Sequence, residues 1–265
     1  MKALITGASS GIGRDMARVL SEKGYDLILT ARREDRLQQL KKELGGSVSV
    51  LPFDLTKTQD CHSLYEKVKG EHIDILINNA GFGVFGAFEE SDLDSELEMI
   101  DVNIRAVHIL TKLFLRDFLK ANRGYILNVS SSAAFLPGPL MAGYYATKAY
   151  VLRLTQAISE ELRRRGSAVS VSVLCPGPVH TEFDQTAGVT FSLKGLSSEF
   201  VARYGIEQML RKKLVIIPGG QMKAIRFLSR FVSDRALLRM AYGQQKRKRG
   251  GSSSKTNHHS GTFPR

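Results

Sequence analysis

Residues 6–13 read Thr-Gly-Ala-Ser-Ser-Gly-Ile-Gly, and they lie between the apolar run 3–6 and a segment whose apolar residues recur at helical spacing. A glycine turn in this position brings exposed backbone N–H groups to the positive end of a helix dipole, where the pyrophosphate of a dinucleotide binds. The stretch therefore predicts a strand, a dinucleotide-binding turn and a helix at the start of the chain.

Each glycine of this turn has its own expected role. Gly7 makes the tight turn, Gly11 leaves out a Cβ where a phosphate would approach, and Gly13 allows the helix to pack closely on the strand. A glycine motif alone is weak evidence, and a plain structural turn is the alternative interpretation. The residues between the glycines that we expect at the same ligand are Ser9, Ser10 and Ile12.

Short apolar, β-branched runs recur along the chain and alternate with segments of helical spacing. Most runs are apolar throughout, which is typical of strands covered on both faces of a parallel sheet. We therefore expect an α/β fold with one doubly wound, Rossmann-type parallel sheet of about seven strands and helices on both faces. The predicted strands are residues 3–6, 26–31, 47–53, 73–78, 124–130, 168–175 and 214–217.

Further motifs follow these strands in order. They are Asp54 after the third strand, Asn78-Asn79-Ala80-Gly81 after the fourth, Asn103, Ser131 after the fifth, the pair Tyr144 and Lys148, and Pro176-Gly177 after the sixth. Together with the glycine turn they resemble the signatures of the classical short-chain dehydrogenase/reductase (SDR) family, over about residues 1–220. Within that family the chain resembles bacterial ketoacyl and carbonyl reductases.

Tyr144 and Lys148 lie four residues apart on a predicted helix, so their side chains share one face. Because a positive charge favours a phenolate, we expect Lys148 to lower the pKa of Tyr144 toward the range useful for acid–base chemistry. The resemblance implies that Tyr144 protonates a carbonyl oxygen and that Lys148 also binds the nicotinamide ribose. It implies that Ser131 hydrogen-bonds the reacting oxygen and that Asn103 holds a water linking Lys148 to solvent.

Neighbouring tyrosines and serines make these assignments ambiguous until spacing is considered. Position 149 is Ala, so Tyr145 has no lysine four residues later. The family's serine precedes its tyrosine by thirteen positions, which selects Ser131 over Ser130 and Ser132. An isolated Tyr-x-x-x-Lys pair would be an ordinary pair on a helix surface.

The second predicted strand is followed by Arg32 and Arg33, with no acid where one would bind the ribose 2′-hydroxyl of NAD. An arginine there accommodates the 2′-phosphate of NADP, so NADP(H) is the expected cofactor and Arg32, first after the strand, is the candidate. Solvated loop charges are the alternative interpretation of both arginines. The other cofactor contacts that the resemblance implies are Asp54, Leu55, Asn79, Tyr144, Lys148, Val179 and Thr181.

Charge is distributed unevenly along the 265 residues. The formal charge is +12, and from Gln221 onward there are 11 Lys or Arg against one acid, Asp234.

We predict a catalytic domain over residues 1–220 with a lid at about 181–205, because so long a loop is usually functional. Residues 221–243 predict a basic amphipathic helix, and residues 244–265 predict a disordered basic tail.

The expected partners follow from side-chain type and from the resemblance. Apolar residues near the predicted nicotinamide site favour an apolar ketone or 3-oxoacyl-type substrate, and the family is usually dimeric or tetrameric. We expect no metal site, because His180 has no second ligand nearby, and no specific nucleic acid. No signal peptide or spanning segment is predicted, so we expect a cytoplasmic protein. The basic helix could contact an anionic membrane surface weakly, or it could equally cover the sheet edge or a subunit partner with its arginines facing water.

A different class of function is also open from the sequence. The chain could be a non-catalytic NADP-binding regulator, or a membrane-surface scaffold that retains the fold. The complete set Asn103, Ser131, Tyr144 and Lys148 argues against it, because a protein without the chemistry has no need of the tyrosine and lysine together.

Overall fold

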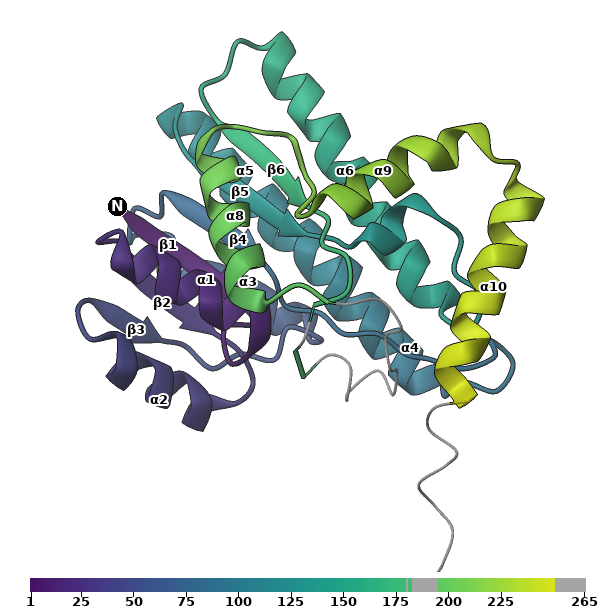
Figure 1. Ribbon diagram of the computed structural model, residues 1–265. Coiled ribbons are helices and arrows are strands. Elements are labelled where there is room, and N and C mark those ends of the chain that lie inside the picture. The colour runs from purple at the N-terminus through teal and green to yellow at the C-terminus, as the bar shows by residue number, and fades with distance from the viewer. Residues whose placement is uncertain (180, 183–194, 251–265) are drawn as a thin grey trace, which may run out of the picture.

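A seven-stranded parallel sheet forms the centre of the molecule (Figure 1). The computed structural model of the chain describes residues 1–179, 181, 182 and 195–250, including the side chains of all of these except 230, 244 and 246–250. The predicted α/β doubly wound fold is confirmed. The strands are β1 (Lys2–Thr6), β2 (Asp26–Thr30), β3 (Val48–Val50), β4 (Ile75–Asn78), β5 (Tyr125–Val129), β6 (Ser170–Leu174) and β7 (Val215–Ile216).

Helical segments connect the strands. The α-helices before β6 are α1 (Gly11–Glu22), α2 (Glu34–Leu44), α3 (Thr58–Val68), α4 (Leu93–Ile100), α5 (Val107–Ala121) and α6 (Ala142–Arg164). A π-helical segment, η1 (Asp101–Ala106), joins α4 to α5, and a 3₁₀ turn, η2 (Ser132–Phe135), follows β5. After β6 come α8 (Ser198–Leu210), α9 (Gly220–Leu228), η3 (Ser229–Phe231) and α10 (Asp234–Gly250).

Helices cover both faces of the sheet (Figure 1). On one face, Met16 of α1 and Ile206 of α8 belong to the same buried cluster as Ile5 of β1. On the other face, Phe114 of α5 belongs to the cluster that contains Leu4. Leu4 and Ile5 are neighbours that serve opposite faces, which explains why the strand is apolar at every position.

The carboxyl ends of all strands meet at one edge of the sheet. The strand order is β3-β2-β1-β4-β5-β6-β7, so the chain winds outward in opposite directions from the point between β1 and β4. Ligands of doubly wound sheets bind in the crevice that this reversal leaves at the carboxyl edge. The register pairs Thr6 with Thr30 and Asn78 with Asn128 near this edge.

A buried polar network lies below the crevice. Asn78 Nδ2 donates to Asn128 Oδ1 (2.8 Å) and to Thr111 Oγ1 (3.0 Å), and Asn128 Nδ2 donates to Thr155 Oγ1 (3.0 Å). All four side chains are buried. The network ties β4 and β5 to α5 and α6, so Asn78 serves the scaffold, while the next residue, Asn79, faces the crevice.

The C-terminal region corrects two predictions. The single helix predicted over residues 221–243 is broken, because Val232 has an extended backbone (φ −108°, ψ 135°) and α10 begins at Asp234. The tail predicted from residue 244 is helical through Gly250. Lys, Arg and Gln are good helix formers, so they extend a helix that has already begun even though they cannot form a core. Residues 251–265 lie outside the described part of the chain.

The predicted lid also differs from the structure. Its last part, from Ser198, is helical, because α8 begins there and is capped by Ser197, whose Oγ accepts a hydrogen bond from Phe200 N (3.2 Å). Leu196 forms an isolated parallel bridge with Val179. The rest of the predicted lid, residues 183–194, and His180 lie outside the described residues.

Candidate active site

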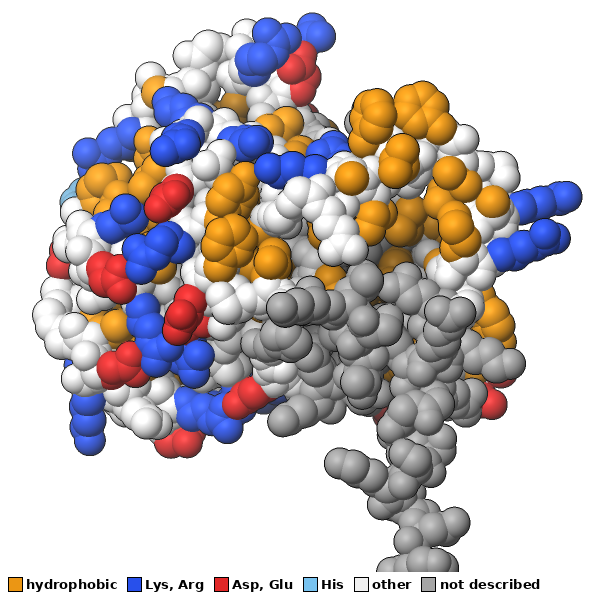
Figure 2. Space-filling view, in the orientation of Figure 1, with side chains coloured by type: hydrophobic (Ala, Val, Ile, Leu, Met, Phe, Trp, Pro, Cys, Tyr) orange, Lys and Arg blue, Asp and Glu red, His pale blue; other side chains and the backbone are white. Residues whose placement is uncertain are grey.

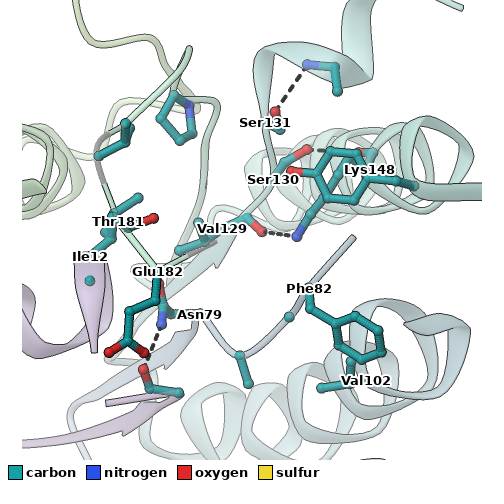
Figure 3. A pocket seen from close by; sticks show the side chains of 18 of the residues that line it. Ile12, Asn79, Phe82, Val102, Val129, Ser130, Ser131, Lys148, Thr181 and Glu182 are labelled. Carbon is teal, nitrogen blue, oxygen red and sulfur yellow. Dashed lines mark hydrogen bonds between the residues drawn. The ribbon is translucent and has the colours of Figure 1, made fainter. Parts of the chain in front are cut away.

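A cavity of about 510 Å³ runs along the carboxyl edge of the sheet. The glycine turn, the ends of β2, β4, β5 and β6, and the start of α6 all contribute to its wall. Figure 3 shows Ile12, Asn79, Thr181 and Glu182 in one part of this wall and Ser131 with Lys148 in another. The cavity therefore brings the predicted dinucleotide turn and the predicted catalytic residues into one space.

The glycine turn has a backbone that other residues would not adopt easily. Gly7 has φ +66° and Gly11 has φ +53°, both in the left-handed region. A Cβ on Gly7 would lie 2.7 Å from Ala80 Cα, and one on Gly13 would lie 2.5 Å from Gly7 O. Gly13 thus leaves room for the turn itself, rather than for the strand as we predicted. The turn fits a pyrophosphate because its glycine backbone lines the cavity at the N-terminus of α1 and larger residues could not adopt this tight conformation.

Asn79 and Thr6 hold this turn against the end of β4. Asn79 Nδ2 donates to Thr6 O (3.0 Å) and Gly7 O (3.2 Å), and Thr6 Oγ1 accepts from the backbone N–H groups of Asn79 (2.9 Å) and Ala80 (3.0 Å). Asn79 also lines the cavity. Its amide is therefore a brace for the turn, and the cofactor contact that we predicted for it stays a prediction.

Two arginines after β2 lie at the outer end of the cavity. Both Arg32 and Arg33 line it, and Arg33 also contacts the turn, donating to Ser9 Oγ (3.2 Å) and Ser10 Oγ (3.0 Å). Glu182 pairs with Arg36 and with Arg33 (2.9 Å), and the hydrogen bonds from Arg36 and then Arg33 hold the pKa of Glu182 below its usual value. Sequence order favoured Arg32, whereas the contacts to the serines belong to Arg33. Only the tertiary structure distinguishes them.

The remaining predicted cofactor residues line the same cavity. Asp54 Oδ1 accepts hydrogen bonds from Thr56 N (3.2 Å) and Thr56 Oγ1 (2.9 Å), and Leu55 beside it is buried. Across the cavity, Thr181 lies so close to the turn that a Cβ on Gly11 would be 3.1 Å from its Cγ2. The other lining residues predicted from sequence are Ser9, Ser10, Ile12 and Val179.

The predicted catalytic side chains meet where β5 ends and α6 begins. Lys148 Nζ lies 5.7 Å from the centroid of the Tyr144 ring and donates to Val129 O (3.2 Å). Ser131 caps η2 by accepting from Ala133 N (3.1 Å), and it faces the cavity. Ser130 donates to Lys148 O (2.7 Å), so its hydroxyl serves the scaffold.

Burial sets the protonation of this pair. Desolvation raises the pKa of Tyr144 to about 12, and a hydrogen bond with Ser131 acts in the opposite direction. Desolvation also lowers the pKa of Lys148 to about 8. Our expectation that Lys148 lowers the pKa of Tyr144 is wrong for this structure, because the loss of hydration is the largest influence on that pKa and raises it. The result is a neutral phenol, which is the form that donates a proton.

Asn103 lies in the π-helical segment η1 and is completely buried. Its Nδ2 donates to Phe82 O (2.9 Å) and Thr147 Oγ1 (3.0 Å), and its Oδ1 accepts from Phe82 N (3.2 Å). π-helical turns often mark functional positions because they redirect one side chain. Here the turn lets Asn103 brace the loop after β4 against α6. The water that the resemblance implies at Asn103 stays a prediction.

The C-terminal helices contribute residues that sequence analysis missed. Met222 and Ile225 of α9 line the cavity. Gln245 of α10 is 2% exposed and donates from Nε2 to the hydroxyl of Tyr145 (2.8 Å), a lining residue beside Tyr144. The one signal in the sequence was the apolar spacing of the helix around Met222, which does not reveal what the helix covers.

Candidate metal ligands and the two cysteines were compared with what metal or thiol chemistry requires, within the described part of the chain. Within it, no group of three or more His, Cys, Asp or Glu side chains lies close enough to hold a metal ion. Cys61 and Cys175 are buried free thiols, and burial raises their pKa to about 11 and about 12. Both therefore stay protonated at neutral pH and are poor nucleophiles.

Comparisons with known proteins agree with this geometry. A family model described as short chain dehydrogenase matches residues 1–190. The chain belongs to the short-chain dehydrogenase family. An uncharacterized oxidoreductase of Staphylococcus saprophyticus is 38% identical to it over 182 residues, which cover 68% of this chain and 74% of that protein.

Two solved short-chain dehydrogenases have the same fold. One, from Sphingobium yanoikuyae in complex with NADPH, is 30% identical, has a TM-score of 0.77, and the match covers 98% of each chain. Another, from Burkholderia phymatum in complex with NAD, is 26% identical, has a TM-score of 0.78, and the match covers 86% of this chain and 92% of that one. As a short-chain dehydrogenase, the chain is an oxidoreductase of NAD(P)-dependent carbonyl–alcohol chemistry.

Proposed function

We propose that this short-chain dehydrogenase is an NADPH-dependent reductase of apolar ketones or 3-oxoacyl-type substrates, and that it also runs in reverse on the secondary alcohols. The observation that carries the proposal is the single cavity shared by two groups of residues. The glycine turn with Arg32 and Arg33 lies in one part of it, and Ser131, Tyr144 and Lys148 lie in another.

The apolar character of the substrate follows from the wall around the catalytic residues. Tyr144 belongs to a cluster with Met141 and Ala133, both buried, and with the partly buried Phe82. The polar side chains that line this region are Ser130, Ser131, Ser132, Tyr144, Tyr145 and Lys148. The other apolar lining residues in this region are Phe135, Leu136, Met222 and Ile225. Such a wall favours a carbonyl group with apolar substituents.

Each catalytic side chain has a role that its position supports. When bound, the reduced nicotinamide supplies a hydride to the carbonyl carbon. Tyr144, held neutral by burial, donates its proton to the carbonyl oxygen. Ser131 hydrogen-bonds that oxygen and orients it toward the phenol. Lys148, buried next to the tyrosine, holds the ribose and stabilises the phenolate that remains after proton transfer.

Assay of the purified protein with NADPH and with NADH tests the reaction. We expect NADPH to be oxidised in the presence of aryl ketones, diketones or 3-oxoacyl thioesters, and charged sugars to be turned over more slowly. The loss of the absorbance of the reduced nicotinamide measures the rate. A protein that binds NADPH but reduces none of these carbonyl compounds would instead be the non-catalytic regulator.

Removal of either arginine after β2 tests the cofactor preference. We expect Arg32→Ala and Arg33→Ala each to raise the KM for NADPH by about tenfold to a hundredfold, because a charge-assisted hydrogen bond to the 2′-phosphate is lost. The KM for NADH should change much less, since NADH has no such phosphate. Steady-state kinetics with both cofactors measures the difference.

Arg36→Ala is the matched control for this experiment. Arg36 pairs with the same Glu182 but does not line the cavity, so the KM values for both cofactors should stay close to those of the wild type. Equal effects of Arg33→Ala on NADPH and NADH would indicate that Arg33 only stabilises the turn. A wild-type protein that prefers NADH would contradict the proposed NADPH dependence.

A further inference from the structure

Several large apolar side chains on the C-terminal helices are exposed to solvent and do not pack into the core of this chain. We call residues 220–250, from α9 through α10, the C-terminal arm. Phe227 and Leu228 are each 59% exposed, and Phe231 is 75% exposed. The two phenylalanine rings contact each other edge to face, with centroids 5.3 Å apart, and still face solvent. Clustered exposed aromatic side chains of this kind mark an interaction surface.

The same surface character continues on α10. Leu238 and Tyr242 are exposed and lie one helical turn apart. Met240, which is 58% exposed, lies on the other side of the helix. Arg235 and Arg239 are also one turn apart and exposed. Figure 2 shows hydrophobic side chains gathered over α9 and the adjoining part of the arm, with Lys or Arg side chains at its outer edge. The surface thus combines apolar and cationic groups.

Charge indicates what covers this surface. From Gln221 to the end of the chain there is a single acid, Asp234, against 11 basic residues. Two copies of the chain meeting arm to arm would bring two strongly basic segments together, and like charges oppose such a contact. Aliphatic side chains such as Leu228 and Leu238 do not stack on nucleic acid bases. An anionic surface with an apolar layer beneath it fits both kinds of group.

We propose that the C-terminal arm docks on the surface of an anionic lipid bilayer. Phe227, Leu228 and Phe231 enter the boundary between headgroups and acyl chains, and Arg235 and Arg239 contact the lipid phosphates. The contact is peripheral: among the described helices, none is long and apolar enough to cross a membrane.

The inner side of the arm connects this surface to the cavity. On α9, Met222 and Ile225 line the cavity, whereas Phe227 and Leu228, a few residues later, face outward. Between them, the Arg226 guanidinium lies 4.8 Å from the centroid of the Phe135 ring, which also lines the cavity. Docking would therefore place the apolar part of the cavity beside the bilayer. That consequence rests on the proposed function and suits a substrate that dissolves in lipid.

Co-sedimentation of the full chain with vesicles tests the proposal. The two vesicle types are pure phosphatidylcholine and an equimolar mixture of phosphatidylcholine with phosphatidylglycerol. We expect binding to the anionic vesicles that weakens with salt. We expect the double variant Phe227→Ser/Phe231→Ser to bind them about tenfold more weakly although it keeps every charge, since the apolar contribution is removed. Arg235→Gln/Arg239→Gln should weaken binding to anionic vesicles alone.

Phe88→Ser is the matched control, because Phe88 is 69% exposed and lies outside the arm. Its vesicle binding should equal that of the wild type. Unchanged binding of the Phe227→Ser/Phe231→Ser variant would overturn the proposal. So would dissociation of an oligomer by that variant in the absence of lipid, because the surface would then be a subunit interface. Vesicle binding is measured without turnover, so the result is independent of whether the proposed reaction is correct.

Discussion

Replacement of Tyr144 by Phe is expected to lower kcat by about 10²- to 10⁴-fold, the usual contribution of a positioned proton donor. The variant keeps the ring that packs with Met99, Ala133 and Met141, so the fold and the cavity wall should persist. It loses only the hydroxyl group, whose pKa burial raises to about 12. NADPH affinity, measured by fluorescence titration, should stay within a few-fold of the wild-type value, and stopped-flow absorbance should show the loss of hydride transfer.

Tyr150→Phe provides the control on the same helix. Tyr150 is exposed, bonds to His108 Nδ1 (2.6 Å) and does not line the cavity, so loss of its hydroxyl should leave kcat near the wild-type value. Wild-type turnover in Tyr144→Phe would remove Tyr144 as the proton donor. A parallel loss of NADPH affinity and turnover in that variant would indicate damage to the cofactor site instead.

Replacement of Gly13 by Ala is the second change with a large expected effect. The new Cβ would lie 2.5 Å from Gly7 O and would overlap the Asn79 amide as well. Gly7 O is a backbone atom, and the Asn79 amide is held in place by its bonds to Thr6 O and Gly7 O, so the backbone must shift. We expect a loss of about 1–3 kcal/mol of stability from overpacking. Displacement of the turn should also lower kcat/KM for NADPH by about 10²-fold.

Gly86→Ala separates this effect from a general cost of replacing glycine. A Cβ on Gly86 would find its first neighbour at 3.6 Å, in the ordinary contact range, so its stability and kinetics should change little. Urea unfolding measures stability and NADPH titration measures affinity. A Gly13→Ala variant that binds NADPH as tightly as the wild type would show that the turn is not the cofactor cradle.

Sequence analysis predicted the parts of the site that depend on local geometry. The glycine turn of residues 6–13 was found because a strand, a turn and a helix must follow one another there. Tyr144 and Lys148 were paired because helical spacing fixes which side chains share a face. Ser131 and Ser130 are adjacent, alike in type and both line the cavity, yet the Ser130 hydroxyl bonds to Lys148 O, which agrees with the choice of Ser131 from its spacing to Tyr144.

Other features depended on segments that are distant in the chain. Arg33 rather than Arg32 contacts Ser9 and Ser10, because the fold brings the residues after β2 over the turn after β1. Likewise, Gln245 reaches Tyr145 from 100 positions away. No spacing rule predicts such contacts, because they depend on how the helices pack on the sheet.

The sequence by itself determined the order of the motifs along the chain and, through their resemblance to known signatures, the family. It also predicted which side chains are catalytic, because that resemblance rests on short spacings. Only the tertiary structure decided the protonation of Tyr144 and which sides of the C-terminal helices are covered. It buried Tyr144 so deeply that desolvation raises its pKa, where local reasoning from Lys148 predicted the opposite. It also divided the basic C-terminus into an inner side on the cavity and an exposed aromatic side. Burial and packing are properties of the assembled fold, and a helix alone does not specify which of its faces will be covered.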